Sequence, residues 1–485
     1  MSSSPRPCVA VTGASGFVGS NLLPALEEDF RVVALGRHPR PATEHVEWRT
    51  CDLYSASSTR AALEGVDVAI YLVHSMMPSS RLFQGSFHDT DLLLADNFSR
   101  ACVTHGVKQI IYLGGLVPDS GYISPHLQSR REVETVLQST GIPVTCLRAG
   151  MVVGPGGSSF EILHALVQRL PWMVLPRWTK SLGQAIFIDD VVAVLRAAVQ
   201  SPAFIGQTMN LVNGEALTYE DLLRKTAAVL GKRRLMLPVP IASTGFSKRW
   251  VQLFSGASHE LISPLIDSLQ CDLPQPSPVE PITGLISYRR FEDMLAETLR
   301  RTKPKTPGGR PATARAETSV RSIQRLPPLP TRDARFISSA YMTWLPLFFR
   351  AIIRVKPVAG STRLTFSVPF LPWPLLVLEL ISEASDDARD KFHIVGGFLS
   401  KTTTTGWLEF RQVSQRRHTL AAIHGFVPAL PWLLYRLSQA PVHAFVMACF
   451  GRYLARTNPV TPGVPSPGAP AATDSEQTPA PRRLR

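Results

Sequence analysis

The sequence predicts an α/β protein with a doubly wound parallel sheet, followed by a smaller α+β domain. Three observations lead to this fold class. Short apolar segments alternate with helical segments in the first part of the chain, and a glycine-rich turn follows the first of them. A stretch rich in Pro and Arg then separates this part from a second part with a different pattern. Alternating strands and helices are typical of a parallel sheet with right-handed crossovers.

Six segments of the first part have strand character, and Val and Ile dominate several of them, as expected for strands buried on both faces. The predicted strands are Cys8–Thr12, Arg31–Leu35, Val46–Thr50, Val68–Val73, Gln109–Leu113 and Val144–Arg148. Two connecting segments have helical character, Thr90–His105 and Pro125–Ser139. Pro125 favours a helix that begins near Ser124.

A glycine-rich turn joins the first predicted strand to the first predicted helix. Gly13 makes the turn, Gly16 lets phosphates approach, and Gly19 lets the helix pack on the strand. Backbone amides at such a helix start can hold a pyrophosphate. The turn therefore predicts a dinucleotide-binding Rossmann domain, and the alternative is an ordinary glycine-rich turn.

The chain is expected to divide into four parts. Residues 5–300 form the Rossmann domain, 301–335 a basic Pro-rich linker, 336–456 an α+β domain, and 457–485 a disordered tail rich in Pro, Ala, Ser and Thr. In the α+β part, His393–Leu399 and Gly406–Val413 have the character of paired strands around Lys401–Thr405. A helical pattern then continues to about Ala455.

The composition and the charge of the chain limit the classes of function that it can have. Hydrophobic residues make up 45% and charged residues 18%, which is typical of a globular protein. The net charge is +14, and the stretch from Arg300 to Arg335 contributes +8, with ten basic residues against Glu317 and Asp333. We interpret it as a solvated connector, and contact with anionic lipid or nucleic acid is the alternative. We expect no nucleic-acid partner. Six scattered cysteines without a C-x-x-C pair predict neither a disulfide framework nor a metal site.

The segments Tyr341–Ile353, Phe366–Ile381 and Ala421–Tyr453 are apolar, but prolines or charges interrupt them, so we predict no membrane span. Met1–Pro7 lacks the apolar core of a signal peptide. We expect a cytoplasmic protein, and peripheral contact with the inner face of the membrane stays open.

Several motifs of the first part resemble the atypical short-chain dehydrogenase/reductase (SDR) proteins, in the branch close to NmrA-like and complex I accessory-subunit-like Rossmann proteins. The resemblance covers roughly residues 5–300 and implies a fold and a cofactor class, but no substrate. The matching stretches are Thr12–Gly19, Cys51–Leu53, Tyr71–Met76, Ser124–Leu127, Leu147–Gly150, Val153–Gly156 and Ile188–Val191.

Arg37 follows the second strand, where an NAD-preferring site would place an acidic residue. A guanidinium there can hold a 2′-phosphate, which favours NADP(H) over NAD(H); a surface arginine is the alternative. The resemblance implies that Asp52 and Leu53 flank the adenine and that Val73 and His74 lie beside the ribose, although His74 could be structural. The predicted cofactor-binding residues are Thr12, Gly13, Ser15, Gly16, Phe17, Val18, Gly19, Arg37, Asp52, Leu53, Val73, His74 and Arg130.

The catalytic signature departs from the family pattern of a Tyr four residues before a Lys, with a Ser upstream. Glu134 sets the register, which puts Arg130 at the lysine position and His126 at the tyrosine position, with Tyr122 one turn earlier. His126 can donate a proton near neutral pH, whereas Arg130 can hold a ribose but cannot share a proton. Alternatively, His126 and Arg130 bind ribose or solvent and do no chemistry.

In the second part, Trp407–Arg411 and Tyr435–His443 are similar to START-like, helix-grip domains, which implies a sheet around a long helix and an apolar cavity. Three functions follow from the two resemblances: an NADPH-dependent oxidoreductase acting on an apolar carbonyl, enone or quinone-like compound; a non-catalytic NADP(H) sensor or assembly factor; and a carrier of a lipid or other hydrophobic ligand. The oligomeric state stays open.

Overall fold

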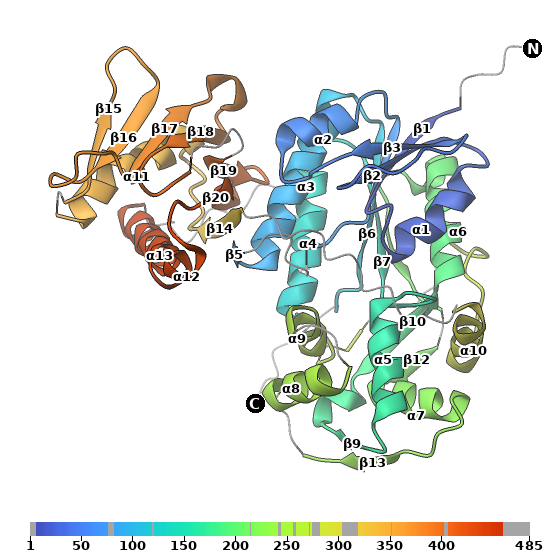
Figure 1. The fold of residues 1–485 in the computed structure, drawn as a ribbon. Coiled ribbons are helices and arrows are strands. Elements are labelled where there is room, and N and C mark those ends of the chain that lie inside the picture. The colour runs from blue at the N-terminus through green and yellow to red at the C-terminus, as the bar shows by residue number, and fades with distance from the viewer. Residues whose placement is uncertain are drawn as a thin grey trace, which may run out of the picture.

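Figure 1 shows the two domains of the protein in a computed structural model. The structure describes residues 6–75, 82–118, 121–213, 215–240, 244–255, 259–270, 272–273, 282–302, 319–350, 352–401 and 406–458. Residues 303–318 of the predicted linker, nearly all of the predicted tail and most of the Lys401–Thr405 connection lie outside the described residues.

The N-terminal domain is built on a parallel sheet of seven strands in the order β11-β7-β6-β4-β1-β2-β3. This order confirms the doubly wound sheet. Strands β2 and β3 extend it on one side of β1, and the later strands, beginning with β4, extend it on the other side. All six predicted strands are present, and β11 is an additional one. The strands are β1 (Cys8–Thr12), β2 (Arg31–Gly36), β3 (Val46–Thr50), β4 (Val68–Tyr71), β6 (Gln109–Gly115), β7 (Val144–Ala149) and β11 (Thr208–Leu211).

Helices cover both faces of this sheet. Apolar side chains of α1 (Phe17–Leu26) and α6 (Ile188–Gln200) pack on one face. Those of α2 (Ala56–Ala62), α3 (Phe87–Thr104) and α4 (Pro125–Gln138) pack on the other. The two predicted helices correspond to α3 and α4, and α4 begins one residue after its cap Ser124, as Pro125 predicts.

A smaller lobe follows the main sheet and appears below it in Figure 1. Its core joins α5, α7, α8 and α9 to a two-stranded sheet. The helices are α5 (Ser158–Arg169), α7 (Tyr219–Val229), α8 (Thr244–Ser255), α9 (His259–Ser268) and α10 (Phe291–Arg301). The short strands are β8 (Met151–Val153), β9 (Trp172–Leu175), β10 (Leu182–Phe187), β12 (Ala216–Thr218) and β13 (Leu235–Pro238).

The C-terminal domain is an antiparallel sheet of seven strands in the order β15-β16-β17-β18-β19-β20-β14, which confirms an α+β domain. Aromatic rings of α11 (Ala334–Phe348), β19 and α13 (Gln439–Thr457) form its core, with centroids of Tyr341, Phe410 and Phe450 within 5.0–6.4 Å of one another. The other elements are β14 (Val320–Leu326), β15 (Arg354–Pro357), β16 (Arg363–Ser367), β17 (Leu376–Leu380), β18 (Arg389–Gly396), β19 (Trp407–Val413), β20 (His418–Phe426) and α12 (Trp432–Leu437).

Two expectations for the second part were wrong. Residues 320–326, expected in the linker, form β14, whose alternation of apolar and polar side chains is broken by a bulge between Val320 and Ser322. Residues 418–426, expected to be helical, form β20. Its Leu-Ala-Ala-Ile run suits a helix by composition, but pairing on both sides with β14 and β19 overrides that local preference.

The two domains share a sheet edge and a core. Strand β5 (Leu82–Gln84), from the N-terminal domain, pairs in parallel with β14. Ile323, Leu420 and Ala422 of the C-terminal sheet pack into the same apolar core as α2 and α3. Arg325, which we expected in a solvated connector, instead joins the domains through Asp89, at 2.6 Å, and Glu132, at 2.8 Å.

Candidate cofactor and active site

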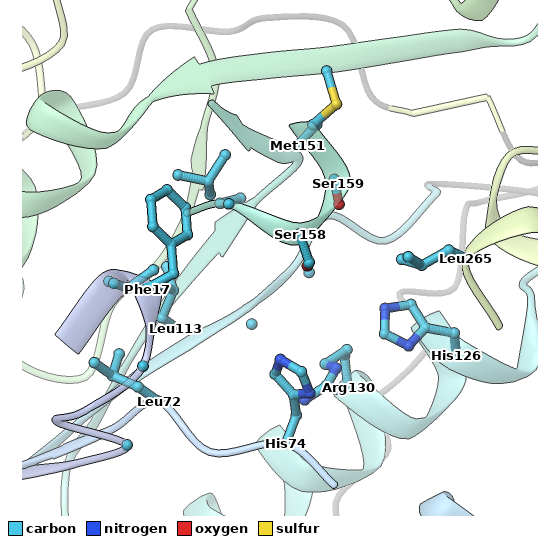
Figure 2. A pocket seen from close by; sticks show the side chains of 18 of the residues that line it. Phe17, Leu72, His74, Leu113, His126, Arg130, Met151, Ser158, Ser159 and Leu265 are labelled. Carbon is cyan, nitrogen blue, oxygen red and sulfur yellow. The ribbon is translucent and has the colours of Figure 1, made fainter. Parts of the chain in front are cut away.

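A cavity of about 700 Å³ opens at the carboxyl ends of β1, β2, β4 and β6. This is the edge where parallel α/β sheets bind their ligands, beside the point where the strand order reverses. All thirteen predicted cofactor-binding residues line the cavity. Figure 2 shows that Phe17 lies on one side of it and that His74, His126 and Arg130 lie on another.

The turn after β1 is held in one shape by short contacts. The Thr12 hydroxyl donates to the Ile70 carbonyl at 3.2 Å and accepts from the Leu72 amide at 3.0 Å, which ties the turn to β4. Gly13 has a φ of +65°, which favours glycine. A Cβ on Gly19 would lie 2.4 Å from the Gly13 carbonyl oxygen, so a larger residue there would push α1 off the turn.

The first helix begins at this turn with its amides uncovered. Gly16 caps α1 and offers no side-chain acceptor to the amides that follow. Unpaired amides and the positive end of the helix dipole favour an anion at this place. The residues of the turn therefore fit the diphosphate of a dinucleotide.

Arg37 follows β2 and Asp52 follows β3, and both line the cavity. Arg37 is exposed and makes no ion pair with any described residue, so its guanidinium is open to a ligand in the cavity. The Asp52 carboxylate accepts from the Tyr54 amide at 3.2 Å and faces Arg321 of the C-terminal domain at 3.4 Å. The guanidinium of Arg321 also lies 4.1 Å over the Tyr54 ring. The second domain thus supports this wall of the cavity.

The candidate catalytic residues separate into two groups. His126 and Arg130 are one turn apart on α4 and both line the cavity. Tyr122 precedes the cap of α4, is 57% exposed, and is not among the described residues that line the cavity. The structure therefore brings together two of the three predicted catalytic residues and leaves Tyr122 outside.

Arg130 is buried beside one carboxylate. Its guanidinium lies 3.7 Å from Asp91, and its Nη2 atom has no hydrogen-bond partner among the described residues. Asp91 accepts instead from the amide and hydroxyl of Ser75, both at 2.8 Å, and from the Ser129 hydroxyl at 3.2 Å. Arg130 thus keeps donors for a ligand while a fixed carboxylate balances its charge.

Both histidines near Arg130 are neutral in this environment. Burial, and secondarily the charge of Arg130, lowers the pKa of His126 well below its usual value. The same causes lower the pKa of His74 to about 3, although its outer edge faces the cavity. We expected His126 to donate a proton near neutral pH, which requires a protonated ring at that pH. The lowered pKa does not fit that expectation. The Nδ1 atom of His126 has no partner among the described residues.

An apolar wall, which we did not predict, forms the far arm of the cavity. It starts at Ser158 and Ser159 at the beginning of α5 and continues over four helices, with no charged side chain among its described residues. Ile262, Leu265, Ile266 and Leu269 show the one-sided helical spacing that could have revealed α9 as part of this wall. Its apolar members are Ile162, Leu163, Leu166, Trp178, Leu222, Leu223, Val251, Ile262, Leu265, Ile266, Leu269 and Leu273.

Residues 9–211 match the model of the NAD dependent epimerase/dehydratase family, the part of the chain that contains the glycine turn and α4. The N-terminal domain has the doubly wound sheet of a Rossmann domain, and most of this domain matches the family model. The match ends before α7, α8 and α9, so it does not cover the helices that form most of the apolar wall. The C-terminal domain also lies outside the match.

Similar proteins include reductases. The chain is 29% identical over 140 residues to the auxiliary protein GraX of Staphylococcus aureus, a match that covers 28% of this chain and only 44% of GraX. It is 26% identical over 246 residues to the ceramide reductase of Caulobacter vibrioides, covering 50% of this chain and 76% of that protein. Among solved structures, the Citrobacter sp. triphenylmethane reductase complexed with NADP(H) matches 60% of this chain and 99% of its own, with 20% identity and a TM-score of 0.46.

Proposed function

We propose that this protein is an NADPH-dependent oxidoreductase of the atypical SDR type that reduces an apolar carbonyl, enone or quinone-like substrate. One observation carries the proposal. The cavity that holds the dinucleotide-type glycine turn continues, past Arg130 and His126, into an arm whose described walls are apolar. A substrate in that arm would present its polar group to Arg130 and leave the rest among aliphatic side chains.

The glycine turn and Arg37 suit NADPH. The diphosphate would lie on the uncapped amides at the start of α1, and Arg37, exposed and without an ion pair among the described residues, would hold the 2′-phosphate. NAD(H) stays the alternative cofactor. When bound, the reduced nicotinamide would supply the hydride.

Arg130 and His126 would serve the carbonyl oxygen. Nη2 of Arg130 is buried and has no hydrogen-bond partner within the described chain, so it can donate to that oxygen and stabilise the negative charge that develops there. Asp91 is the positioning residue that holds the guanidinium on this side of α4. Neutral His126 can relay a proton from water by accepting it on one ring nitrogen and releasing one from the other. The carbonyl carbon gains the hydride and its oxygen gains that proton, which yields an alcohol.

The apolar arm favours this substrate class over the sugar nucleotides of an epimerase. A nucleoside diphosphate sugar would bring a second diphosphate into the cavity, and burying that charge is costly without cations or several donors. No described side chain of the arm is charged. The name of one relative, a ceramide reductase, supports reduction of a lipid-like substrate.

The other two functions have less support. The sensor hypothesis rests on the missing Ser-Tyr-Lys set, and binding of NADPH without turnover would favour it. The carrier hypothesis rests on the charge of the predicted linker and on the apolar segments of the C-terminal part. Rings of Tyr341, Trp344, Phe410 and Phe450 lie between the C-terminal sheet and its helices, where a carried ligand would have to lie.

The test follows the loss of NADPH absorbance with a panel of long-chain ketones, aromatic aldehydes and quinones. UDP-glucose is the polar comparison, and its conversion is followed by chromatography of the sugar nucleotides in the presence of NAD⁺, because an epimerisation consumes no NADPH. We expect turnover with at least one apolar compound and none with UDP-glucose. Conversion of UDP-glucose alone would overturn the proposed substrate class. Tight NADPH binding without oxidation across the whole panel would replace the reductase with a sensor.

A further inference from the structure

We infer that one end of the C-terminal domain docks on the surface of an anionic lipid bilayer. This inference does not rest on the proposed reaction. Among the helices that the structure describes, none combines the length and the apolar character that crossing a bilayer requires. The contact that we infer is therefore made by exposed side chains on a folded surface.

Strand register places three connections at the same end of the C-terminal sheet. Arg354, at the start of β15, pairs with Ser367 at the end of β16, and Phe366 pairs with Leu376 at the start of β17. Val377 in turn pairs with Gly396 at the end of β18. The exit of α11, the β16–β17 connection and the β18–β19 connection therefore meet at this end.

Contacts between the connections add α12 and the start of α13 to the same end. The Phe398 amide donates to the Pro374 carbonyl at 2.8 Å, and the Ala429 amide, just before α12, donates to the Leu399 carbonyl at 3.1 Å. The rings of Phe348, in α11, and Phe445, in α13, lie 6.2 Å apart. We call this region, residues 347–354, 368–375, 397–401 and 429–445 as far as described, the apolar end.

Large apolar side chains at the apolar end are exposed. Phe370 is 77% exposed and Trp373 is 64% exposed, on the β16–β17 connection. The others at this end that exceed one-half are Leu347, Ile352, Phe398, Leu433, Leu434, Leu437, Val442 and Phe445. Single exposed apolar residues are common, but a cluster of them on one end of a domain marks an interaction surface.

The charges around these side chains indicate which kind of partner fits this surface. Arg350, Arg354, Lys401 and Arg436 are exposed at the apolar end and make no ion pair with a described residue. The sequence has no Asp or Glu in residues 334–378, 392–408 or 410–458. Phe, Trp and Leu surrounded by unpaired cations, without acids, match the boundary of an anionic membrane, where apolar side chains enter the acyl region and cations contact phosphates.

Vesicle co-sedimentation of the full chain tests this inference. The vesicles contain phosphatidylcholine alone or with phosphatidylglycerol. We expect binding to the anionic vesicles that weakens with added salt, and weaker binding to the neutral ones. The double variant Phe370→Ser/Trp373→Ser should lower the partition coefficient by about 10-fold or more, because it removes two aromatic side chains from the membrane. The double variant Arg354→Glu/Arg436→Glu should weaken binding to anionic vesicles only.

The matched control is Trp172→Ser. Trp172 is 53% exposed on β9, in the N-terminal domain, and its loss should leave vesicle binding unchanged. Circular dichroism and thermal unfolding show that each variant is folded. Failure of the wild-type chain to bind either vesicle, or equal losses with Trp172→Ser and Phe370→Ser/Trp373→Ser, would overturn the inference. A dimer in sedimentation velocity that only the Phe370/Trp373 variant dissociates, without vesicle binding, would also overturn it and assign this end to a second copy.

Discussion

Arg130 of α4 and Asp91 of α3 face each other across 3.7 Å, and both side chains are buried. The carboxylate is already bonded to Ser75 and Ser129, so it balances the charge of the guanidinium without occupying all its donors. A charged group that is held in place but incompletely paired is costly for stability and useful for binding. This relationship is the centre of the proposed active site.

Arg130→Met should lower kcat/KM for the carbonyl substrate by about 100-fold, because a donor to the developing oxyanion is lost. Steady-state kinetics with NADPH would measure the effect. Arg131→Met is the matched control, since Arg131 is the next residue on α4 and is exposed. Equal activities of the two variants would remove Arg130 from the mechanism.

Arg37→Ala should raise the dissociation constant for NADPH by about 10-fold or more and leave that for NADH unchanged, because only NADPH carries the 2′-phosphate. Titration calorimetry with both cofactors would measure the difference. Arg233→Ala removes an equally exposed charge away from the cavity and should change neither constant. Parallel losses for NADPH and NADH would contradict the assigned role of Arg37.

Gly19→Ala should abolish dinucleotide binding and destabilise the N-terminal domain, because the added methyl group would lie 2.4 Å from the Gly13 carbonyl oxygen. Gly451→Ala tests the same substitution within α13, where the nearest atom would be 3.6 Å away. That variant should keep or raise stability by up to about 1 kcal/mol. Thermal unfolding of both variants, with and without NADPH, measures these effects. Normal NADPH binding by Gly19→Ala would contradict the claim that the turn has no room for a side chain at this position.

Arg411 of β19 should be the strongest single contact between the domains. It is buried and donates to Asn97 at 2.7 Å and to Asp96 at 3.1 Å, both on α3. Arg411→Met should cost about 3 kcal/mol in urea unfolding, because buried Glu409 loses its ion pair and Asn97 loses a donor, while Asp96 keeps its ion pair with Arg100. Arg363→Met breaks an ion pair with Glu379 that is half exposed, and should cost less than about 1 kcal/mol. Similar losses of unfolding free energy in the two variants would show that the contacts of Arg411 with Asp96 and Asn97 do not stabilise the protein.

His424 should make the stability of the protein depend on pH. It is 1% exposed, and burial lowers its pKa well below 6.5, so it stays neutral in the folded chain. The unfolded chain takes up a proton on it below pH 6.5, so stability falls as the pH drops, by about 1.4 kcal/mol per pH unit for one histidine. Urea unfolding at several pH values should show a shallower dependence for His424→Leu. An unchanged slope would show that His424 is protonated in the folded state.

The fold of the first domain was accessible from sequence because its signals are local. The predicted strands from β1 to β7 are mostly apolar, except β3, and the turn at Gly13, Gly16 and Gly19 has a fixed spacing. The start of α4 at Pro125 was also a local signal. The residues that line the cofactor side of the cavity followed from these elements and from the resemblance to atypical SDR proteins.

Features that depend on distant partners were missed. The strand pairing of β14 with β5 joins residues far apart in the chain, so Arg321 and Arg325 had only the composition of a linker. Likewise, the contacts of Arg411 with α3 cross the domain boundary. The apolar wall needs four helices to meet, and its one local signal, the spacing in α9, does not say which surface the helix faces.

The most direct test uses NADPH with deuterium at both C4 positions of the nicotinamide, with the apolar carbonyl panel and mass spectrometry of the products. Our account predicts an alcohol with one deuterium on the former carbonyl carbon, and a strong loss of that product with Arg130→Met. Bound NADPH that transfers no deuterium to any compound would contradict the account.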